Sequence, residues 1–332
     1  MQQLLRKIAF PISLVYALVV YLRNFLYDVG IFTSKSYATP TICVGNLSVG
    51  GTGKTPMTEY LIRELKGHRT AVLSRGYKRK SKGFLLAMPQ STVLDLGDEP
   101  YQLYRKFPEV AIAVDADRRN GVAQLEEFIK PEVIVLDDAF QHRRVKPSFS
   151  ILLTAYGNLY VDDWYLPTGN LRDSKKEATR ADLIVVTKCP DTLSDVERGQ
   201  IKGKLRPKVH QQVLFASLKY HDRVFDGNGK SMELLDLKQR QVALVTGIAA
   251  PKPLVDHLTS LGIPFEHFAF GDHHHFSEKD MRQFKGHEIV LTTEKDFVRL
   301  EGRLENLHYV QVAHHFDDAD SAILEERVKN LL

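Results

Sequence analysis

Residues 41–56, TICVGNLSVGGTGKTP, pass from a short β-branched run into a glycine-rich loop that ends in Gly53-Lys54-Thr55. Consecutive glycines allow backbone N–H groups to turn inward around a phosphate, while a lysine reaches the β- and γ-phosphates and a threonine hydroxyl binds Mg²⁺. The pattern predicts a P-loop. The predicted nucleotide-binding residues are Ser48, Val49, Gly50, Gly51, Thr52, Gly53, Lys54 and Thr55.

The loop departs at one position from the common pattern G-x-x-x-x-G-K-[ST], because Ser48 stands where the first glycine is expected. Residues 58–66 (TEYLIRELK) then carry apolar side chains at helical spacing. A glycine turn with an incidental Lys-Thr pair would not require this order of strand, loop and helix. The context therefore favours a phosphate-binding loop over a purely structural turn.

The composition is typical of a globular chain. The 332 residues are 43% hydrophobic and 26% charged, which suits about two domains and argues against a disordered or fibrous protein. The formal net charge of +4 is mild, so no nucleic-acid partner is predicted. The two cysteines, Cys43 and Cys189, lack metal-ligand spacing and are typical of a reducing compartment.

The N-terminal segment is the most apolar part of the chain. Residues 8–22 (IAFPISLVYALVVYL) lie between Arg6-Lys7 and Arg23. The run is shorter than the ~20 residues of a spanning helix, and no small-residue cleavage site follows it. Two interpretations remain open, a helix that lies in a membrane interface and a helix packed in the core, because an apolar helical pattern occurs in both.

Polar residues follow several predicted strands. Residues 133–136 (VIVL) lead into Asp137 and Asp138, an acid pair that is expected to bind Mg²⁺ together with Thr55. Carboxylates are poor choices for a buried strand end unless they meet a cation, so a purely structural role is disfavoured.

Two other stretches allow more than one interpretation. Residues 78–82 carry four cations after a strand, and they either bind an anionic substrate group or form a solvated loop. Asp98 precedes a helix predicted over residues 101–107, so an N-cap is an alternative to a chemical role for this carboxylate.

Further strands in the second half predict another α/β unit. They cover residues 149–153, 183–187, 213–218, 242–246 and 288–293. We therefore predict an α/β protein with two α/β/α domains. Its parts are an apolar membrane-interface helix at residues 1–28, a P-loop kinase domain with a mostly parallel sheet at 29–150, and a second α/β domain at 151–332 that closes the active-site cleft and whose C-terminal end packs back on the first.

Seven short motifs occur in order along the chain. They are GNLSVGGTGKTP, SRGYKRK, GDEPYQL, VLDDAFQHR, LPTGNLRD, FGDHHHFS and LTTEKDFVRL. Taken together they closely resemble the tetraacyldisaccharide 4'-kinase family of lipid A biosynthesis, and the similarity extends from the N-terminal helix to Leu300. Two departures are Ala139, where a glycine often follows the acid pair, and His274-His275, where other polar or aromatic residues stand.

The resemblance implies an activity. A member of this family transfers the γ-phosphoryl group of ATP, with Mg²⁺, to the 4'-hydroxyl of tetraacyldisaccharide 1-phosphate. The implied location is the cytoplasmic face of the inner membrane, where a peripheral or monotopic enzyme meets its lipid substrate at the membrane surface without an obligate protein partner.

The resemblance also implies roles for single residues. Asp98 would accept the proton of the 4'-hydroxyl, His273 would orient Asp98, and Lys54 would hold the phosphates. Since Asp98 and His273 are 175 residues apart, a cleft that closes is expected to complete the site. Contacts with the sugar or its 1-phosphate are implied for Arg75, Lys78, Arg79, Asn170 and Arg172, and positions near the phosphates or the metal for Glu99, Arg118, Gln141 and His142.

The implied substrate bears on the N-terminal helix. Four acyl chains leave a bilayer only at a cost of about 0.8 kcal/mol per methylene, so the enzyme has to approach the membrane.

The alternative to a lipid kinase is a membrane-associated P-loop ATPase that acts as a switch without a lipid substrate. It would share the helix, the P-loop and the acid pair, but it would not need Asp98. A soluble small-molecule kinase or ligase, in turn, would not need residues 1–28.

Overall fold

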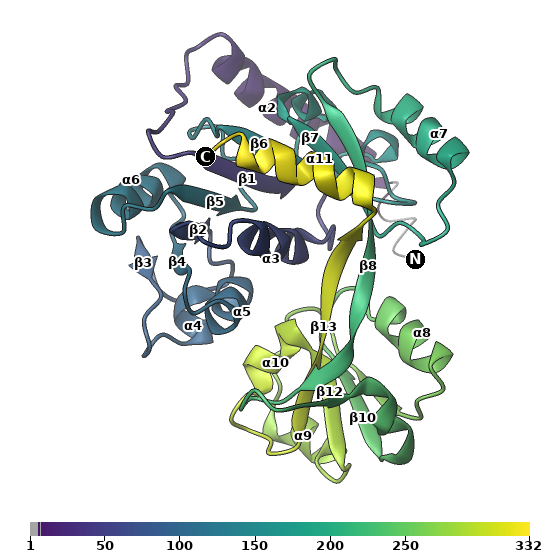
Figure 1. Cartoon of the computed structure of the whole chain (residues 1–332). Helices are drawn as coiled ribbons and strands as arrows, with labels where there is room; N and C mark the ends of the chain where they lie inside the picture. The colour runs from purple at the N-terminus through teal and green to yellow at the C-terminus, as the bar shows by residue number, and fades with distance from the viewer. Residues whose placement is uncertain (1–5, 7) are drawn as a thin grey trace.

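The computed structural model describes residues 6 and 8–332, which are organised around a 13-stranded, mostly parallel sheet (Figure 1). The antiparallel pairs are β13–β8, β3–β4 and β8–β9. In order across the sheet, the strands are β11 (Glu266–Ala269), β10 (Val242–Thr246), β12 (Ile289–Thr293), β13 (Leu307–Phe316), β8 (Gln212–Phe225), β7 (Leu183–Thr187), β6 (Phe149–Ala155), β1 (Thr41–Asn46), β5 (Val133–Asp137), β2 (Thr70–Ser74), β4 (Ala111–Val114) and β3 (Leu85–Leu86), with β9 (Ser231–Glu233) beside β8. The predicted α/β class with a mostly parallel sheet is confirmed.

Helices cover both faces of this sheet. They are α2 (Phe10–Asp28), α3 (Lys54–Glu64), α4 (Val93–Leu96), α5 (Asp98–Lys106), α6 (Arg118–Phe128), α7 (Asp195–Leu205), α8 (Lys252–Ser260), α9 (Glu278–Phe284), α10 (Glu294–Leu300) and α11 (Asp318–Lys329), with short 3-10 helices at Tyr160–Asp162, Lys175–Arg180 and Leu234–Gln239.

The P-loop half of the sheet is buried on both faces. Every residue of β1 and β5 is buried, as expected for parallel strands between two layers of helices. Residues of α6 and α7 complete the core on one face, and residues of α3, α5 and α11 complete it on the other. The carboxyl ends of β1 and β5 therefore meet at one edge, where the P-loop and the acid pair follow.

Strands β8 and β13 join the two halves of the sheet. The first part of β8 pairs with β7, and its second part pairs with β13, whose first residues pair with β12. Figure 1 shows these two strands running from the larger half to the smaller half. The smaller half has its own core, to which α8, α9 and α10 contribute. Two separate cores are thus connected by a two-stranded ribbon.

The pairing of β6 bears on the boundary predicted at residue 150. This residue lies inside β6, which pairs with β1, and β7 continues the same sheet. The larger half therefore extends as far as the first part of β8, and α11 packs back on its core through Leu324 and Val328. We propose a division in which the smaller half runs from the second part of β8 to the first part of β13.

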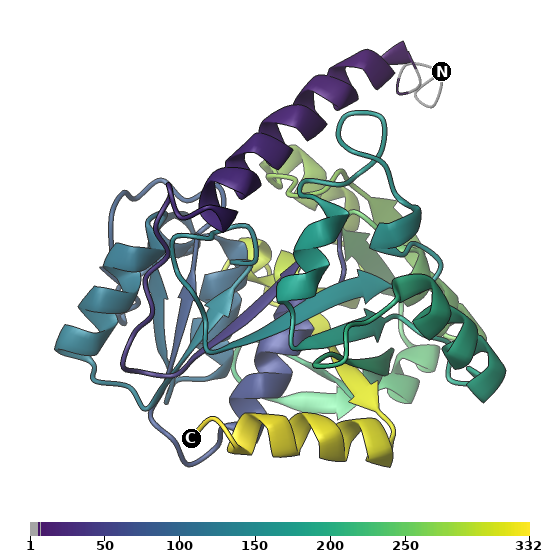
Figure 2. The ribbon, with the colours of Figure 1, turned by 90° about the horizontal axis from the view of Figure 1, so that it is seen from above.

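Helix α2 lies along the outside of the larger half (Figure 2). Its polar residues Ser13 and Asn24 are buried against the protein, whereas Leu14 and Leu18 are 56% and 65% exposed. A helix packed in the core would bury its apolar stripe, so that interpretation is wrong for α2. By length and composition α2 could cross or anchor to a membrane. Residues 1–5 and 7 of the predicted N-terminal segment lie outside the described residues.

Candidate active site

The P-loop leaves the carboxyl end of β1 and enters α3 at Lys54, with Thr55 as the next helical residue. Gly50 has a φ of 116°, and Gly53, the N-cap of α3, has a φ of 85°. Glycine adopts both conformations without steric cost. A Cβ atom on Gly53 would also lie 2.7 Å from Nε2 of His314. Glycine is therefore required at position 53 on two grounds.

The tip of the P-loop is open and its base is buried. Val49, Gly50 and Gly51 are exposed, whereas Ser48 and Thr52 are buried. The N–H groups at the start of α3 belong to a helix N-terminus, which binds anions through its unpaired N–H groups and dipole.

The acid pair at the end of β5 has two different environments. Asp137 is buried and accepts hydrogen bonds from the hydroxyls of Ser74 and Thr58 at 3.0 and 3.4 Å. Burial and the neighbouring Asp138 raise the pKa of Asp137 to about 6. Burial also acts to raise the pKa of Asp138, but Lys54 and Arg172 outweigh it and hold this pKa below its ordinary value.

Lys54 lies between the P-loop and the acid pair. Its Nζ is 3.8 Å from Oδ2 of Asp138 and 3.4 Å from Oδ1 of Asn46. Burial lowers the pKa of Lys54, while Asp138 opposes this shift. Arg172 binds the same two partners, since its guanidinium donates to the carboxylate of Asp138 and to the side-chain oxygen of Asn46. Two cations therefore converge on one carboxylate beside the P-loop.

A second cluster forms where α5 meets the smaller half. Nδ1 of His273 lies 2.8 Å from Oδ2 of Asp98, and Arg299 of α10 donates to the same oxygen. Burial acts to raise the pKa of Asp98, but Arg299 and His273 bring it below its ordinary value. The N-cap of α5 is Gly97, so the interpretation of Asp98 as an N-cap is wrong.

Neighbouring charges extend this cluster. Lys295 of α10 pairs with Glu99 at 3.1 Å and with Asp272 at 3.5 Å, and its Nζ is 3.2 Å from Nε2 of His273. The structure therefore brings together Asp98, Glu99 and His273 from two halves of the molecule.

Three of the residues expected near the phosphates lie around the same edge of the sheet. Arg118 is buried, and its Nη2 donates to the backbone oxygen of Asp137 at 3.4 Å. Gln141 donates to the backbone oxygen of Asn46 at 2.7 Å. Burial, followed by the charge of Arg118, lowers the pKa of His142 to about 4, so this ring is neutral at physiological pH.

The residues expected to meet the sugar are dispersed. Arg75 and Lys78 are exposed, and Arg79 donates to the backbone oxygens of Val114 and Gly83. Arg172 and Asn170 instead lie at the nucleotide site, Arg172 through Asp138 and Asn170 through its backbone oxygen, which accepts from Val49 at 2.7 Å.

Comparisons with known proteins agree with this geometry. A family model described as tetraacyldisaccharide-1-P 4'-kinase matches residues 5–331. Proteins named tetraacyldisaccharide 4'-kinase are 47% identical in Flavobacterium johnsoniae, covering 99% of both chains, and 46% identical in Bacteroides thetaiotaomicron, covering 89% of this chain and 83% of that protein. The chain belongs to this kinase family. A crystal structure of LpxK from Aquifex aeolicus in complex with ATP is similar to the chain with a TM-score of 0.81 and 32% identity, covering 98% and 99% of the two chains.

The site of this family member fits ATP and Mg²⁺. A Cβ atom on Gly50 would meet no other atom within 4 Å, so the exposed tip of the loop leaves room for a ligand beside its backbone. Lys54 and Arg172 provide positive charge at its edge, as triphosphate binding requires. Carboxylate and hydroxyl oxygens are suitable ligands for Mg²⁺, and Asp137, Asp138 and Thr55 would supply them here.

Several residues of the kinase site were not predicted. Asn46 lies in the motif GNLSVGGTGKTP but was given no role, and His314 belongs to none of the recognised motifs. Lys295 and Arg299 lie in the motif LTTEKDFVRL, which was recognised but given no role. The carboxylates of the GDEP stretch need cationic partners when half-buried, and this requirement could have pointed to Arg299.

A buried ion cluster joins α3, α5 and α10 beside the kinase site. Lys106 contacts Glu59 at 2.7 Å and Glu294 at 2.6 Å. Burial and Glu59 raise the pKa of Glu294 to about 7. We expect Lys106→Met to destabilise the protein by about 3–5 kcal/mol, because the buried Glu294 would lose its paired cation and face Glu59, which keeps its pair with Arg63. Thermal unfolding measures this loss, and Glu294→Gln added to Lys106→Met should recover part of it.

The same cluster gives a pH dependence. The pKa of Glu294 is higher in the folded protein than in the unfolded chain, so the folded state holds this proton more tightly. The free energy of unfolding that Glu294 contributes is therefore greatest below its ordinary pKa and is lost as the pH rises towards about 7. The free energy of unfolding of the wild type should therefore fall relative to that of Glu294→Gln as the pH rises from roughly 4.5 to 7. A difference that is constant over this range would contradict the assignment.

Proposed function

We propose that this chain transfers the γ-phosphoryl group of ATP to the 4'-hydroxyl of tetraacyldisaccharide 1-phosphate, with Asp98 as the proton acceptor. The observation that carries this role is the Asp98–His273–Arg299 cluster, which lies where the two halves meet. Both contacts use Oδ2 of Asp98, and within the described residues no hydrogen bond engages Oδ1. Oδ1 is thus suited to accept a hydrogen bond from an alcohol.

The neighbours of Asp98 account for how it handles the proton. Arg299 and His273 keep the carboxylate ionised, which makes it able to accept a proton but only weakly basic. His273 is hydrogen-bonded to this carboxylate, so it can orient the group and share the proton as the hydroxyl attacks. Arg299 donates to the same oxygen from beside His273, since its Nη2 lies 3.0 Å from Nδ1 of this ring.

Phosphoryl transfer depends mainly on alignment and on neutralisation of charge. In the proposed mechanism, Lys54 and the backbone of residues 50–53 bind the phosphates, and Arg172 balances the charge that develops on them. Thr55, Asp137 and Asp138 would hold Mg²⁺. When bound, Mg²⁺ supplies further positive charge at the transferred group.

Transfer of labelled γ-phosphate to the purified lipid acceptor tests this proposal. We expect a labelled lipid product and little ATP consumption without the acceptor. Vigorous acceptor-free turnover with no labelled lipid would instead favour the switch ATPase.

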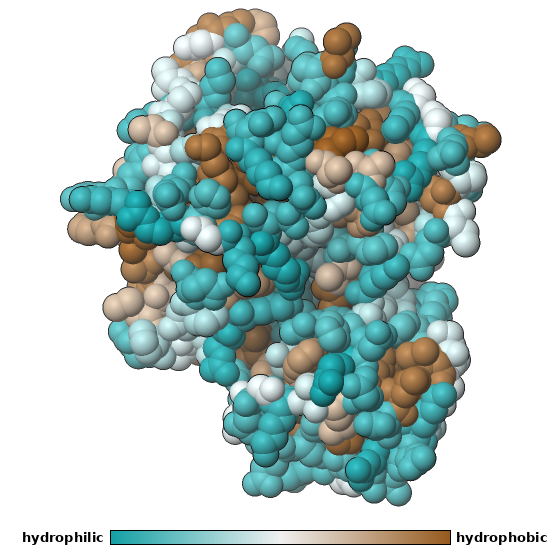
Figure 3. All heavy atoms as spheres, in the orientation of Figure 1, coloured by the Kyte–Doolittle hydropathy of each residue, from teal (hydrophilic) through white to brown (hydrophobic). Residues whose placement is uncertain are grey.

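The position of α2 supports membrane docking. Its exposed apolar side chains form one face, made up of Ile12, Leu14, Val15, Leu18, Val19, Tyr21, Leu22 and Phe25. Figure 3 shows a largely hydrophilic surface on the face in view, with apolar residues at the upper edge where α2 lies in Figure 1. An apolar helical face of this kind buries itself in the boundary between head groups and acyl chains. The proposed location is the cytoplasmic face of the inner membrane.

We expect the triple substitution Leu14→Ser, Leu18→Ser and Leu22→Ser to weaken binding to phospholipid vesicles by at least about 100-fold. Each leucine is more than half exposed in the protein, and burying a leucine side chain contributes about 1.5–3 kcal/mol. Vesicle sedimentation measures the effect. Leu235→Ser is the matched control, because Leu235 is 53% exposed but lies far along the chain in a 3-10 helix. Equal binding of the triple variant and the control would exclude α2 as the docking element.

A further inference from the structure

The segment of residues 163–173, here called the bridging loop, lies between α2 and the P-loop. On one side it contacts α2. Ser13 and Thr168 share two hydrogen bonds of 2.7 and 3.0 Å, and the hydroxyl of Tyr16 donates to the backbone oxygen of Arg172 at 3.1 Å. Phe10 packs edge-on against Trp164 with ring centroids 5.7 Å apart.

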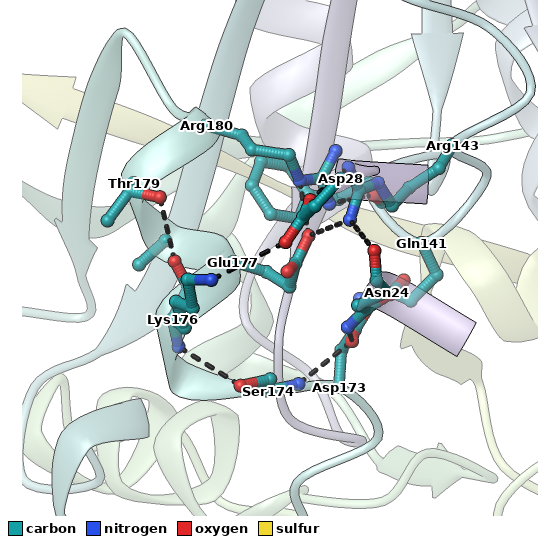
Figure 4. A network of polar contacts seen from close by, with 12 residues as sticks. Asn24, Asp28, Gln141, Arg143, Asp173, Ser174, Lys176, Glu177, Thr179 and Arg180 are labelled. Carbon is teal, nitrogen blue, oxygen red and sulfur yellow. Dashed lines mark hydrogen bonds and ion pairs between the residues drawn. The ribbon is translucent and has the colours of Figure 1, made fainter. Parts of the chain in front are cut away.

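The end of the bridging loop is fixed to α2 by a buried carboxylate. The side chain of Asp173 is fully buried, accepts from Asn24 at 2.7 Å and pairs with Arg23 at 2.9 Å. Figure 4 shows Asn24 and Asp173 within a larger polar network, in which Arg143 contacts the backbone oxygen of Asn24 and the carboxylate of Asp28. A buried charge with this many partners holds its neighbours in a defined arrangement.

On its other side the bridging loop pairs with the first residues of the P-loop. The N–H of Val49 donates to the backbone oxygen of Asn170 at 2.7 Å, and the N–H of Arg172 donates to the backbone oxygen of Leu47 at 2.8 Å. The hydroxyl of Ser48 donates to Oδ2 of the buried Asp163 at 2.9 Å. The other oxygen of this carboxylate accepts from two backbone N–H groups within the bridging loop.

These contacts account for the unusual residue at the start of the P-loop. Glycine would provide no hydroxyl, and the buried Asp163 would lose the partner that Ser48 supplies. A buried carboxylate that loses a hydrogen bond is costly, so the bridging loop gives a structural reason for serine at position 48. Arg172 provides a second connection between α2 and the nucleotide site. Its backbone oxygen accepts from Tyr16 of α2, while its side chain donates to Asp138.

We propose that the bridging loop is a positioning element that couples the seating of α2 to the P-loop. In this arrangement Tyr16 and Ser48 are positioning residues for the nucleotide site, and neither has to touch the nucleotide to affect its binding. The inference rests on the proposed function only in taking α2 as the membrane-docking helix. It predicts that disturbing the inner face of α2 alters nucleotide affinity, whereas disturbing the outer face alters membrane binding.

The test measures the affinity of the full chain for ADP with Mg²⁺ by calorimetry in detergent micelles. Tyr16→Phe should weaken binding by about two- to tenfold, the effect expected for loss of one hydrogen bond. Ser48→Ala should weaken it to a similar extent. Tyr21→Phe is the matched control on the same helix, because Tyr21 is 58% exposed on the outer face, and it should leave the affinity unchanged.

The double variant Tyr16→Phe, Ser48→Ala decides whether the two residues act through one element. Coupled residues give a combined loss smaller than the product of the single losses. ADP affinity equal to the wild type in Tyr16→Phe, or a lowered melting temperature without any change in affinity, would overturn the proposal. Since ADP binding needs no lipid acceptor, this result is independent of whether the chain phosphorylates the proposed lipid.

Discussion

Replacing Asp98 with asparagine should lower the rate of phosphate transfer to the lipid acceptor by about 10²–10⁴-fold, the range in which a positioned general base contributes. Asparagine keeps the shape of the side chain but cannot accept the proton of the 4'-hydroxyl. Arg299 would also lose one of its two carboxylate partners, since it donates to both Asp98 and Asp296. The measurement is the turnover number at saturating ATP and lipid.

Two controls separate this loss from misfolding. ADP affinity should remain close to the wild type, because Asp98 belongs to the cluster at α10 rather than to the P-loop. Asp191→Asn removes an exposed aspartate and should leave turnover unchanged. Near-normal turnover of Asp98→Asn would show that another group accepts the proton, even if the lipid kinase activity itself is real.

The nucleotide site could be predicted from the sequence because its parts are local. A β-branched strand, a glycine-rich loop and a helix follow one another within residues 41–66, and each leaves its own pattern. The acid pair was found for the same reason, since Asp137 and Asp138 end an apolar strand. The order of these elements was enough to place Lys54 near the acids.

The partners of Asp98 were only partly predictable. His273 was predicted from the resemblance to a family. Arg299 and Lys295 were missed because their contacts depend on how α10 packs against α5, and Asp98 and Arg299 are 201 residues apart in the sequence. The boundary predicted at residue 150 likewise depended on contacts between segments that are distant in the chain. A strand pattern shows that a segment is buried but not which strand lies beside it, so β6 and β7 could not be assigned to the first sheet.

The P-loop lies in the larger half, whereas the cluster at Asp98 draws its residues from both halves, and in the proposed mechanism both act on the same transferred group. Asp98 lies at the start of α5 in the larger half, while His273 and Arg299 come from the smaller half. The buried contacts of Lys106 with Glu59 and Glu294 join the same halves. We propose that closure of the smaller half completes the environment of Asp98, since opening would leave this carboxylate without His273 and Arg299.

Lys54→Met should lower turnover by about 10²–10³-fold, as for the loss of one donor aimed at developing charge. The methionine side chain has similar length but no charge, and Lys54 is the P-loop cation nearest Asp138 at 3.8 Å. The substitution should also weaken ADP binding by about 10- to 150-fold, because a hydrogen bond to a charged group contributes about 1.5–3 kcal/mol. Turnover and calorimetry measure the two effects.

The fold should survive this substitution, because Arg172 still pairs with Asp138 after Lys54 is removed. Lys66→Met is the matched control, since Lys66 is exposed just beyond the end of α3 and should be silent in both measurements. Lys54→Arg keeps the charge but replaces a compact ammonium with a planar group, so it should restore only part of the activity. Turnover of Lys54→Met within threefold of the wild type would mean that the glycine-rich loop does not hold the transferred phosphate.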